Sequence, residues 1–283
     1  MQKISCQAIV LGLRDYGEAD LIVSLFSPHT GKLQAIAKSA RKSKRRFVNK
    51  LEIFTLLSAV LRPSRAGLPL VEEAELINSF LELRHNAALY AAASLIREFL
   101  LAATHEGNGD PDMFLLSLWV LDSLDRSLPQ SLSQGSLQTG PTVPAQSRSL
   151  SCRAITAQFL TRYYDRIGYR PELEHCQKCG KTLTTGPPWL FGVARGGIVC
   201  PSCASSGSPN QGPGQGPSQP IQPGTAKFLS SCLNAPLNHL NRLKIAAAPL
   251  NEALRLLQAY GDTVLGREII SWRLFWQLTD ALG

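Results

Sequence analysis

The sequence predicts an α+β protein in which a small five-stranded β-barrel is followed by an all-α domain that carries an inserted module with four cysteines. Three observations support this fold class. Short runs rich in Ile, Val and Leu alternate with turn residues over residues 4–78, the apolar spacing becomes helical from about residue 80, and two Cys-x-x-Cys pairs lie within residues 176–203.

The barrel is predicted to occupy residues 1–80. Five segments in this range have the short length and the apolar or alternating pattern of strands, and turn residues separate them. The expected strands are residues 4–11, 21–27, 32–38, 51–61 and 70–77. Because closing a sheet removes its exposed edges, so many short strands in one segment favour a closed barrel.

The helical domain is predicted to comprise residues 81–169 and 226–283. Its second helix should begin at Asp110-Pro111, because aspartate can accept a hydrogen bond from a free N–H group and proline at the first position loses none. The expected helices are residues 89–104, 110–126, 151–167, 226–233 and 250–282. The aromatic residues of the last one, Trp272, Phe275 and Trp276, are interpreted as core residues.

The cysteine-bearing module is predicted to occupy residues 170–205. Residues 127–149 and 206–225 are rich in Ser, Gln, Pro and Gly and contain few bulky apolar side chains. Such segments cannot bury enough apolar surface to offset the entropy lost on ordering, so we predict that both are flexible linkers.

The composition favours a polyanionic partner and argues against a membrane. Lys and Arg outnumber Asp and Glu by 29 to 21, which gives a formal charge of +8. No apolar run is long enough for a transmembrane helix, and the N-terminus lacks the pattern of a secretory signal peptide. Since the seven cysteines do not have the pattern of a secreted disulfide framework, we expect a cytoplasmic protein.

The two Cys-x-x-Cys pairs predict one structural zinc ion per chain. Cys176 and Cys179 are followed after twenty residues by Cys200 and Cys203, a spacing typical of a tetrahedral four-thiolate site. Four protein ligands leave no open position on the metal, so the ion is not expected to activate water. We interpret His175, beside the first pair, as a surface residue or as one that contacts a metal ligand without binding the metal itself.

A dense basic run predicts the nucleic-acid-binding site. Seven basic residues and no acidic residue fall within thirteen positions, and like charges packed this closely favour an incoming anion. The residues are Lys38, Arg41, Lys42, Lys44, Arg45, Arg46 and Lys50. Phe47 within the run could stack on a base or could belong to the core, and its position in the sequence does not decide between these roles.

No catalytic or small-molecule site is predicted. Gly31-Lys32 resembles half of a phosphate-binding loop, but Phe26 stands where the first glycine is required and Leu33 replaces the Ser or Thr. The acids Glu72, Glu73 and Glu75 fit a solvated strand face. Cys6, Cys152 and Cys232 are interpreted as buried apolar residues. We therefore expect a binding protein that is not an enzyme.

The order of these motifs resembles the family of the bacterial recombination mediator RecO. Three groups of residues carry the resemblance. The family's opening is matched by residues 8–11, 16–20, 25–27 and Gly31, and its basic segment is matched by residues 37–43. The family's zinc-bearing members are matched by residues 167–173, the two cysteine pairs and Gly196-Gly197. The two predicted linkers depart from the pattern, so we carry no function onto them.

The resemblance implies a barrel of the oligonucleotide-binding (OB) type, a helical domain and an inserted zinc module. It also implies a DNA repair and recombination function, in which the protein binds single- and double-stranded DNA and anneals complementary strands. With its partner RecR, such a protein helps to load recombinase onto DNA coated by single-strand-binding protein, at the nucleoid. Two alternatives remain open: a zinc-bearing RNA- or ribosome-associated protein, and a metal-dependent nuclease.

Overall fold

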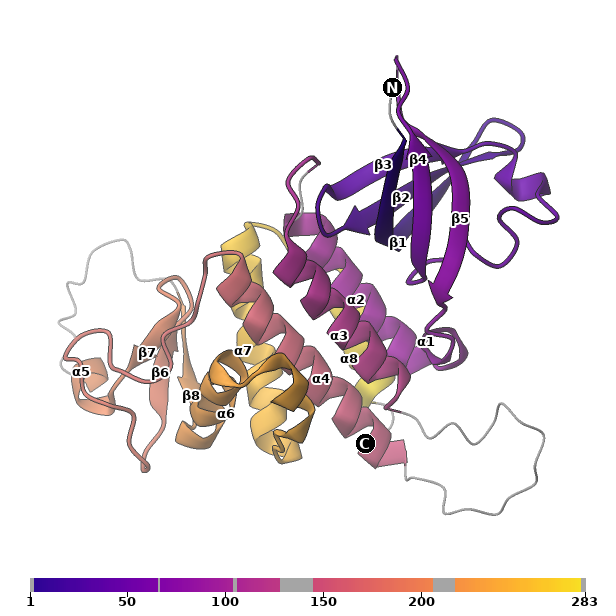
Figure 1. The fold of residues 1–283 in the computed structure, drawn as a ribbon. Helices are drawn as coiled ribbons and strands as arrows, with labels where there is room; N and C mark the ends of the chain where they lie inside the picture. The colour runs from indigo at the N-terminus through magenta and orange to yellow at the C-terminus, as the bar shows by residue number, and fades with distance from the viewer. Residues whose placement is uncertain (1–2, 66, 104–105, 128–144, 206–216, 281–283) are drawn as a thin grey trace. The chain divides into compact units, whose positions relative to one another are not determined.

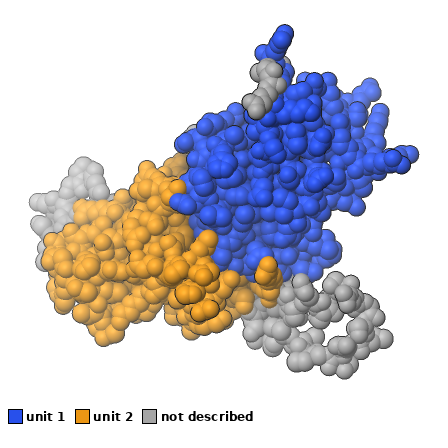
Figure 2. All heavy atoms as spheres, viewed as in Figure 1, with its two compact units in different colours: residues 1–86, 97–125 blue, residues 87–96, 126–283 orange. Residues whose placement is uncertain are grey.

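The computed structural model of the chain describes residues 3–65, 67–103, 106–127, 145–205 and 217–280 (Figure 1). The chain forms two compact units (Figure 2). The first contains residues 1–86 and 97–125, and the second contains residues 87–96 and 126–283. The predicted fold class is confirmed, because a closed five-stranded barrel precedes a mainly helical region.

The barrel consists of five strands with the order β1-β2-β3-β5-β4, and it closes through the pairing of β4 with β1. The only parallel contact described in it joins β3 to β5. The strands are β1 (Ile4–Tyr16), β2 (Asp20–Ser27), β3 (Gly31–Ala37), β4 (Leu56–Arg62) and β5 (Leu70–Asn78). Alternate residues of these strands point inward, so that Val10, Val23 and Leu57 meet in the barrel core.

One strand is shorter than its apolar composition predicts. Residues 51–61 were expected to form a single strand, but β4 begins only at Leu56. Phe54 has a left-handed φ of 75° and its N–H donates to the carbonyl of Val10 at 2.8 Å. Leu51 and Phe54 are nevertheless buried, so these apolar residues fill the core from a turn.

Three helical segments complete the first unit: α1 (Glu82–His85), residues 97–103 of α2 (Ala87–Ala103) and α3 (Pro111–Asp125). The predicted start of α3 is confirmed, because the Asp110 carboxylate accepts a hydrogen bond from the N–H of Met113 at 3.0 Å. Phe114 of α3 packs against Phe26 of β2 with ring centroids 5.8 Å apart. The side chain of Arg97 donates to the carbonyl of Leu11.

In the second unit, α4 (Ala145–Arg166) packs against α6 (Pro223–Asn234), α7 (Ala247–Leu265) and α8 (Ser271–Asp280). The start of α4 corrects the sequence prediction, which placed residues 145–149 in a linker. Contacts distant in sequence anchor this part of the helix: Ser149 donates to the Thr279 carbonyl at 2.5 Å, and the Arg153 guanidinium pairs with Asp280. Residues 128–144 of that linker lie outside the described residues.

The helix expected over residues 250–282 is two helices, α7 and α8. Gly266 ends α7 with a left-handed φ of 63°, a conformation that side chains other than glycine rarely adopt. Trp272 and Phe275 are buried as predicted, whereas Trp276 is only partly buried. Within the described residues, no helix is long and apolar enough to cross a membrane.

A three-stranded antiparallel sheet of order β7-β6-β8 carries the cysteine pairs. Its strands are β6 (Trp189–Gly192), β7 (Gly197–Val199) and β8 (Ser218–Ile221), and the short helix α5 (Pro201–Ser205) follows β7. β8 corrects a second prediction, because residues 218–225 were assigned to a linker. They form a strand on β6 and the start of α6, while residues 206–216 of that linker lie outside the described residues.

Candidate metal centre and nucleic-acid interface

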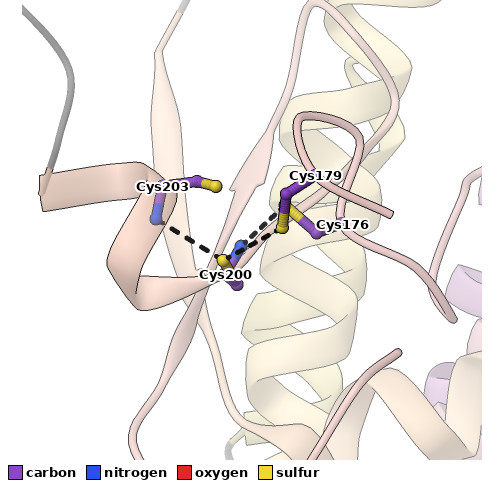
Figure 3. Close-up of side chains that lie close together, drawn as sticks. All are labelled: Cys176, Cys179, Cys200 and Cys203. Carbon is purple, nitrogen blue, oxygen red and sulfur yellow. Dashed lines mark hydrogen bonds between the residues drawn. The ribbon is translucent and has the colours of Figure 1, made fainter. Parts of the chain in front are cut away.

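The four paired cysteines come together in the second unit. Cys176 and Cys179 lie in the loop before β6, Cys200 directly follows β7, and Cys203 lies in α5. All four Sγ atoms lie within 4.8 Å of one another (Figure 3). This is the arrangement that the spacing predicts, and it allows the group to hold one metal ion.

The distances between the sulfurs fit coordination better than disulfide bonding. The Sγ atoms of Cys179 and Cys200 are 3.7 Å apart, whereas a disulfide needs about 2.05 Å. A tetrahedral ion with metal–sulfur bonds of about 2.3 Å places neighbouring sulfurs about 3.8 Å apart. Cys176 and Cys200 are buried, and Cys179 is exposed, so the cluster is accessible from one side.

The charges of the sulfurs also favour a bound cation. Burial disfavours the Cys176 thiolate, but the N–H groups of Cys200, Cys179 and Lys178 outweigh it and lower the pKa of Cys176 to about 6. Hydrogen bonds with the sulfurs of Cys179 and Cys200 raise the pKa of Cys203 to about 12. Ionisation of one thiol thus disfavours ionisation of its neighbours, and a bound cation would stabilise all four thiolates.

Short backbone hydrogen bonds shape the first cysteine loop. The N–H of Gly180 donates to the Cys176 carbonyl at 2.8 Å, and the N–H of Cys176 donates to the Lys181 carbonyl at 2.8 Å. The loop between β6 and β7 is fitted closely to α7. Gly196 has a φ of 64°, and a Cβ atom there would lie 2.4 Å from the Tyr260 hydroxyl oxygen.

His175 and the other three cysteines of the chain are not part of the four-sulfur group. His175 is exposed, and its Nδ1 lies 3.7 Å from the carboxylate of Glu172, so it stands apart from the four sulfurs. Burial raises the pKa of Cys152 and that of Cys232 to about 12, which agrees with their interpretation as apolar core residues. Cys6 is only partly buried, and burial raises its pKa.

The basic run lies between β3 and β4 in the first unit. It starts at Lys38, passes through a short 3-10 helix, η1 (Ala40–Lys42), and continues as an irregular loop; we call residues 38–50 the basic loop. Of its seven predicted binding residues, Lys50 is partly buried and the others are exposed: Lys38, Arg41, Lys42, Lys44, Arg45 and Arg46.

Residues of the β1–β2 hairpin hold the basic loop in place. Their sequence positions did not predict this role. The Asp20 carboxylate accepts a hydrogen bond from the N–H of Ser39 at 2.7 Å, and the Ala19 carbonyl accepts one from the N–H of Arg41 at 3.0 Å. The Arg41 guanidinium also lies 3.4 Å from the Asp15 carboxylate. Asp15 and Asp20 lie outside the basic run in the sequence. Only the three-dimensional structure shows that they contact the basic loop.

The structure decides between the two roles left open for Phe47. Its ring is 4% exposed and belongs to the barrel core, so Phe47 cannot stack on a base. The guanidinium of Arg46 lies over this ring, 4.3 Å from its centroid, and donates to the Lys38 carbonyl at 2.6 Å. Arg46 therefore has a structural role within the loop, which the basic sequence does not predict.

Among the acids of β5, Glu72 is held in two ion pairs. Glu72 lies 2.6 Å from the Lys3 ammonium and 2.9 Å from the Arg62 guanidinium. The hydrogen bond from Lys3 lowers the pKa of Glu72. This pairing agrees with a solvated strand face rather than a pair of catalytic carboxylates.

Comparison with known proteins agrees with this architecture. The family model described as "Recombination protein O N terminal" matches residues 1–80, and "Recombination protein O C terminal" matches residues 151–273. A DNA repair protein RecO of Syntrophobacter fumaroxidans is 33% identical over 201 residues, 71% of each chain. One from an Anaeromyxobacter species is 29% identical over 285 residues, the whole of each chain. This chain therefore belongs to the RecO family of DNA repair proteins.

Proposed function

We propose that this protein binds single- and double-stranded DNA in the cytoplasm, anneals complementary strands and, with RecR, helps to load recombinase onto DNA coated by single-strand-binding protein. It breaks no covalent bonds in this role. RecR, single-strand-binding protein and the nucleoid enter the proposal through the family alone. The features of this chain carry the DNA-binding part.

The observation that carries the proposal is a dense basic loop anchored on a small closed barrel. Lys42, Lys44 and Arg45 are exposed, and none of them makes an ion pair among the described residues. Their charges are therefore available to phosphates, and each phosphate contact releases counterions from the nucleic acid. Neutralising the phosphates of two strands also lowers the repulsion between them, which favours annealing.

The proposal requires no nucleotide hydrolysis. Gly31 and Lys32 are the first two residues of β3, directly after the β2–β3 turn, and they pair with Ser27 and Phe26 of β2. A phosphate-binding loop needs instead a glycine-rich turn between a strand and a helix N-terminus. Annealing should therefore proceed without ATP.

The cysteine group would hold zinc as a structural ion. Cys176, Cys179, Cys200 and Cys203 would supply a closed shell of four thiolates, and zinc so bound stabilises a small module without activating water. Among the residues that the structure describes, this is the one group of three or more metal-ligating side chains. A metal-dependent nuclease would need a second, open site, and we therefore favour a binding function.

The salt dependence of DNA binding tests the proposal. Substituting Lys42, Lys44 and Arg45 by Ser removes three exposed charges and leaves the contacts of Arg41 and Arg46 intact. If each charge neutralises one phosphate of a single strand, the log–log salt slope should become shallower by about 2. Arg242, Lys244 and Arg255, all exposed in the second unit, give a control triple substitution with the same change in charge.

Two outcomes would contradict the proposal. If the basic-loop variant keeps the wild-type slope while the control variant loses it, the DNA path lies on the helical unit. If single-stranded RNA competes more strongly than DNA of the same sequence, the RNA-binding alternative gains support, because an RNA reader should contact the 2′-hydroxyl. Annealing of complementary strands, with and without RecR and single-strand-binding protein, then tests the mediator role.

A further inference from the structure

The first unit exposes one aromatic ring among its described residues. Every phenylalanine described in this unit is buried, and Trp119 is partly buried, whereas the Tyr16 side chain is 52% exposed. Tyr16 is the last residue of β1 and therefore stands at the β1–β2 turn. Single exposed aromatic residues are common on protein surfaces, so the surroundings of this ring decide whether it has a role.

Strand geometry places the side chains of Tyr16 and Asp20 on the same face of the hairpin, and Asp20 holds the start of the basic loop. Tyr16 pairs across the hairpin with Asp20, and side chains of directly opposed residues point to the same side, about 5 Å apart at Cβ. The Asp20 carboxylate binds the N–H of Ser39 at 2.7 Å. Ser39, at the start of the basic loop, is therefore bound by the residue directly across the hairpin from Tyr16.

The charges near Tyr16 favour a neutral ligand group at the ring and phosphates further along the loop. Asp15 and Asp20 are occupied by Arg41 and Ser39, while Glu18, at the turn, is exposed. Carboxylates repel phosphate but not the neutral ring of a base. The free cations Lys42, Lys44 and Arg45 lie later in the loop, where phosphates can bind.

We propose that Tyr16 is the base-stacking residue of a single-strand binding site formed by the β1–β2 turn and the basic loop. This inference rests on the proposed DNA-binding function and adds to it. The basic loop binds any polyanion, including duplex DNA, through its charge. The Tyr16 ring binds only where a base is unstacked, so it supplies the preference for single strands.

Titrations with two strands of equal length separate these contributions. One strand is oligothymidylate, and the other carries abasic residues, so that both present the same number of phosphates. Tyr16→Ala should weaken binding of oligothymidylate by about 5- to 150-fold, the range for losing one stacked base. Binding of the abasic strand and the salt slope of both strands should remain unchanged, because no phosphate contact is lost.

Two variants control for the hydroxyl and for the loss of an exposed tyrosine. Tyr16→Phe keeps the ring and should retain wild-type affinity. Tyr169→Ala removes a tyrosine that is 50% exposed in the second unit and should leave both strands bound as in the wild type. Irradiating the wild-type protein with a strand that contains 5-iodouracil should cross-link Tyr16, which gives a test that does not depend on a variant.

The outcomes distinguish this inference from the proposed function. If Tyr16→Ala binds oligothymidylate like the wild type, or if both strands weaken equally, Tyr16 does not stack on a base. If cross-links map elsewhere, the inference is also overturned. In these cases steep salt dependence of the wild-type protein still supports the proposed function. A wild-type protein that binds neither strand overturns both.

Discussion

The Asp20 carboxylate accepts a hydrogen bond of 2.7 Å from the backbone N–H of Ser39. Ser39 has a left-handed φ of 54°, which is uncommon for a residue other than glycine. The first turn of the basic loop is thus held by a side chain of the neighbouring hairpin. The position of the charges of the basic loop therefore depends on an acidic residue.

Asp20→Ala should loosen the basic loop. Losing this hydrogen bond to a charged acceptor should lower the free energy of unfolding by about 1 kcal/mol, measured by urea denaturation. The amide of Ser39 should also exchange with solvent faster than in the wild type. Glu18→Ala removes the same charge at the exposed turn and should change neither quantity; equal effects of the two variants would show that charge alone matters.

The purified protein should contain one zinc ion per chain, measured by elemental analysis after purification without chelator. Cys179→Ser should lower this content, because the sulfur of Cys179 belongs to the four-sulfur group. Cys152→Ser, at a buried cysteine outside the group, should leave it unchanged. Protein with a full complement of four cysteines but no metal would contradict the assignment.

Removing the metal should loosen the cysteine module and spare the barrel. Without the ion, four closely spaced thiols lose the bonds that join the first cysteine loop to α5. Limited proteolysis in the presence of chelator should therefore cleave within residues 170–205 before it cleaves within residues 4–78. Simultaneous loss of both regions would show that the metal stabilises the whole chain.

Gly196→Ala should be strongly destabilising. The substitution adds the strain of a left-handed φ and places Cβ 2.4 Å from the hydroxyl oxygen of Tyr260, which donates to the Tyr169 carbonyl. We expect a loss of about 2–4 kcal/mol in the free energy of unfolding.

Gly266→Ala is the matched control, because Gly266 has nearly the same φ and a Cβ there would meet nothing within 4 Å. It should lose only about 1 kcal/mol from backbone strain. Equal losses in the two variants would mean that the module moves away from Tyr260 without cost.

The contribution of Glu174 to stability should depend on pH. The Ser230 hydroxyl donates to its carboxylate at 2.5 Å and the Asn234 amide at 3.0 Å, and these bonds lower the pKa of Glu174 below its ordinary value of 4.5. A lowered pKa means that the stabilisation is present above pH 4.5 and is lost as the pH falls through the folded-state value. Wild type should therefore exceed Glu174→Gln in stability at neutral pH.

This difference should disappear in acid, measured by urea denaturation at a series of pH values. Ser230→Ala removes the main cause of the pKa shift and should reduce the same pH-dependent difference. A gap between wild type and Glu174→Gln that stays constant from neutral to acidic pH would show that shape, rather than charge, accounts for it.

Much of the fold and of the candidate metal centre could be predicted from the sequence, because these features depend on local patterns. Five short strands predicted the closed barrel, and the aspartate–proline pair predicted the start of α3 at Pro111. The spacing of the cysteines predicted the group that the structure assembles. In each case residues close in sequence, or a spacing typical of one chemistry, carry the information.

Only the tertiary structure determined the features that depend on contacts between distant segments. Residues 145–149 are helical where Ser149 contacts Thr279, and residues 218–221 form a strand because β6 offers a free edge for pairing. The polar composition of these two segments predicts neither the helix nor the strand, because the sequence of a segment does not show which distant segment will stabilise it.

The same reason separates the two aromatic residues near the basic loop. Phe47 lies within the basic run but turns into the barrel core, whereas Tyr16 lies outside the run in sequence and is exposed across the hairpin from Asp20. The basic sequence by itself determined that the charges gather in one segment. Only the tertiary structure shows the hydrogen bond from Ser39 to Asp20, which joins the start of that segment to the hairpin that carries Tyr16.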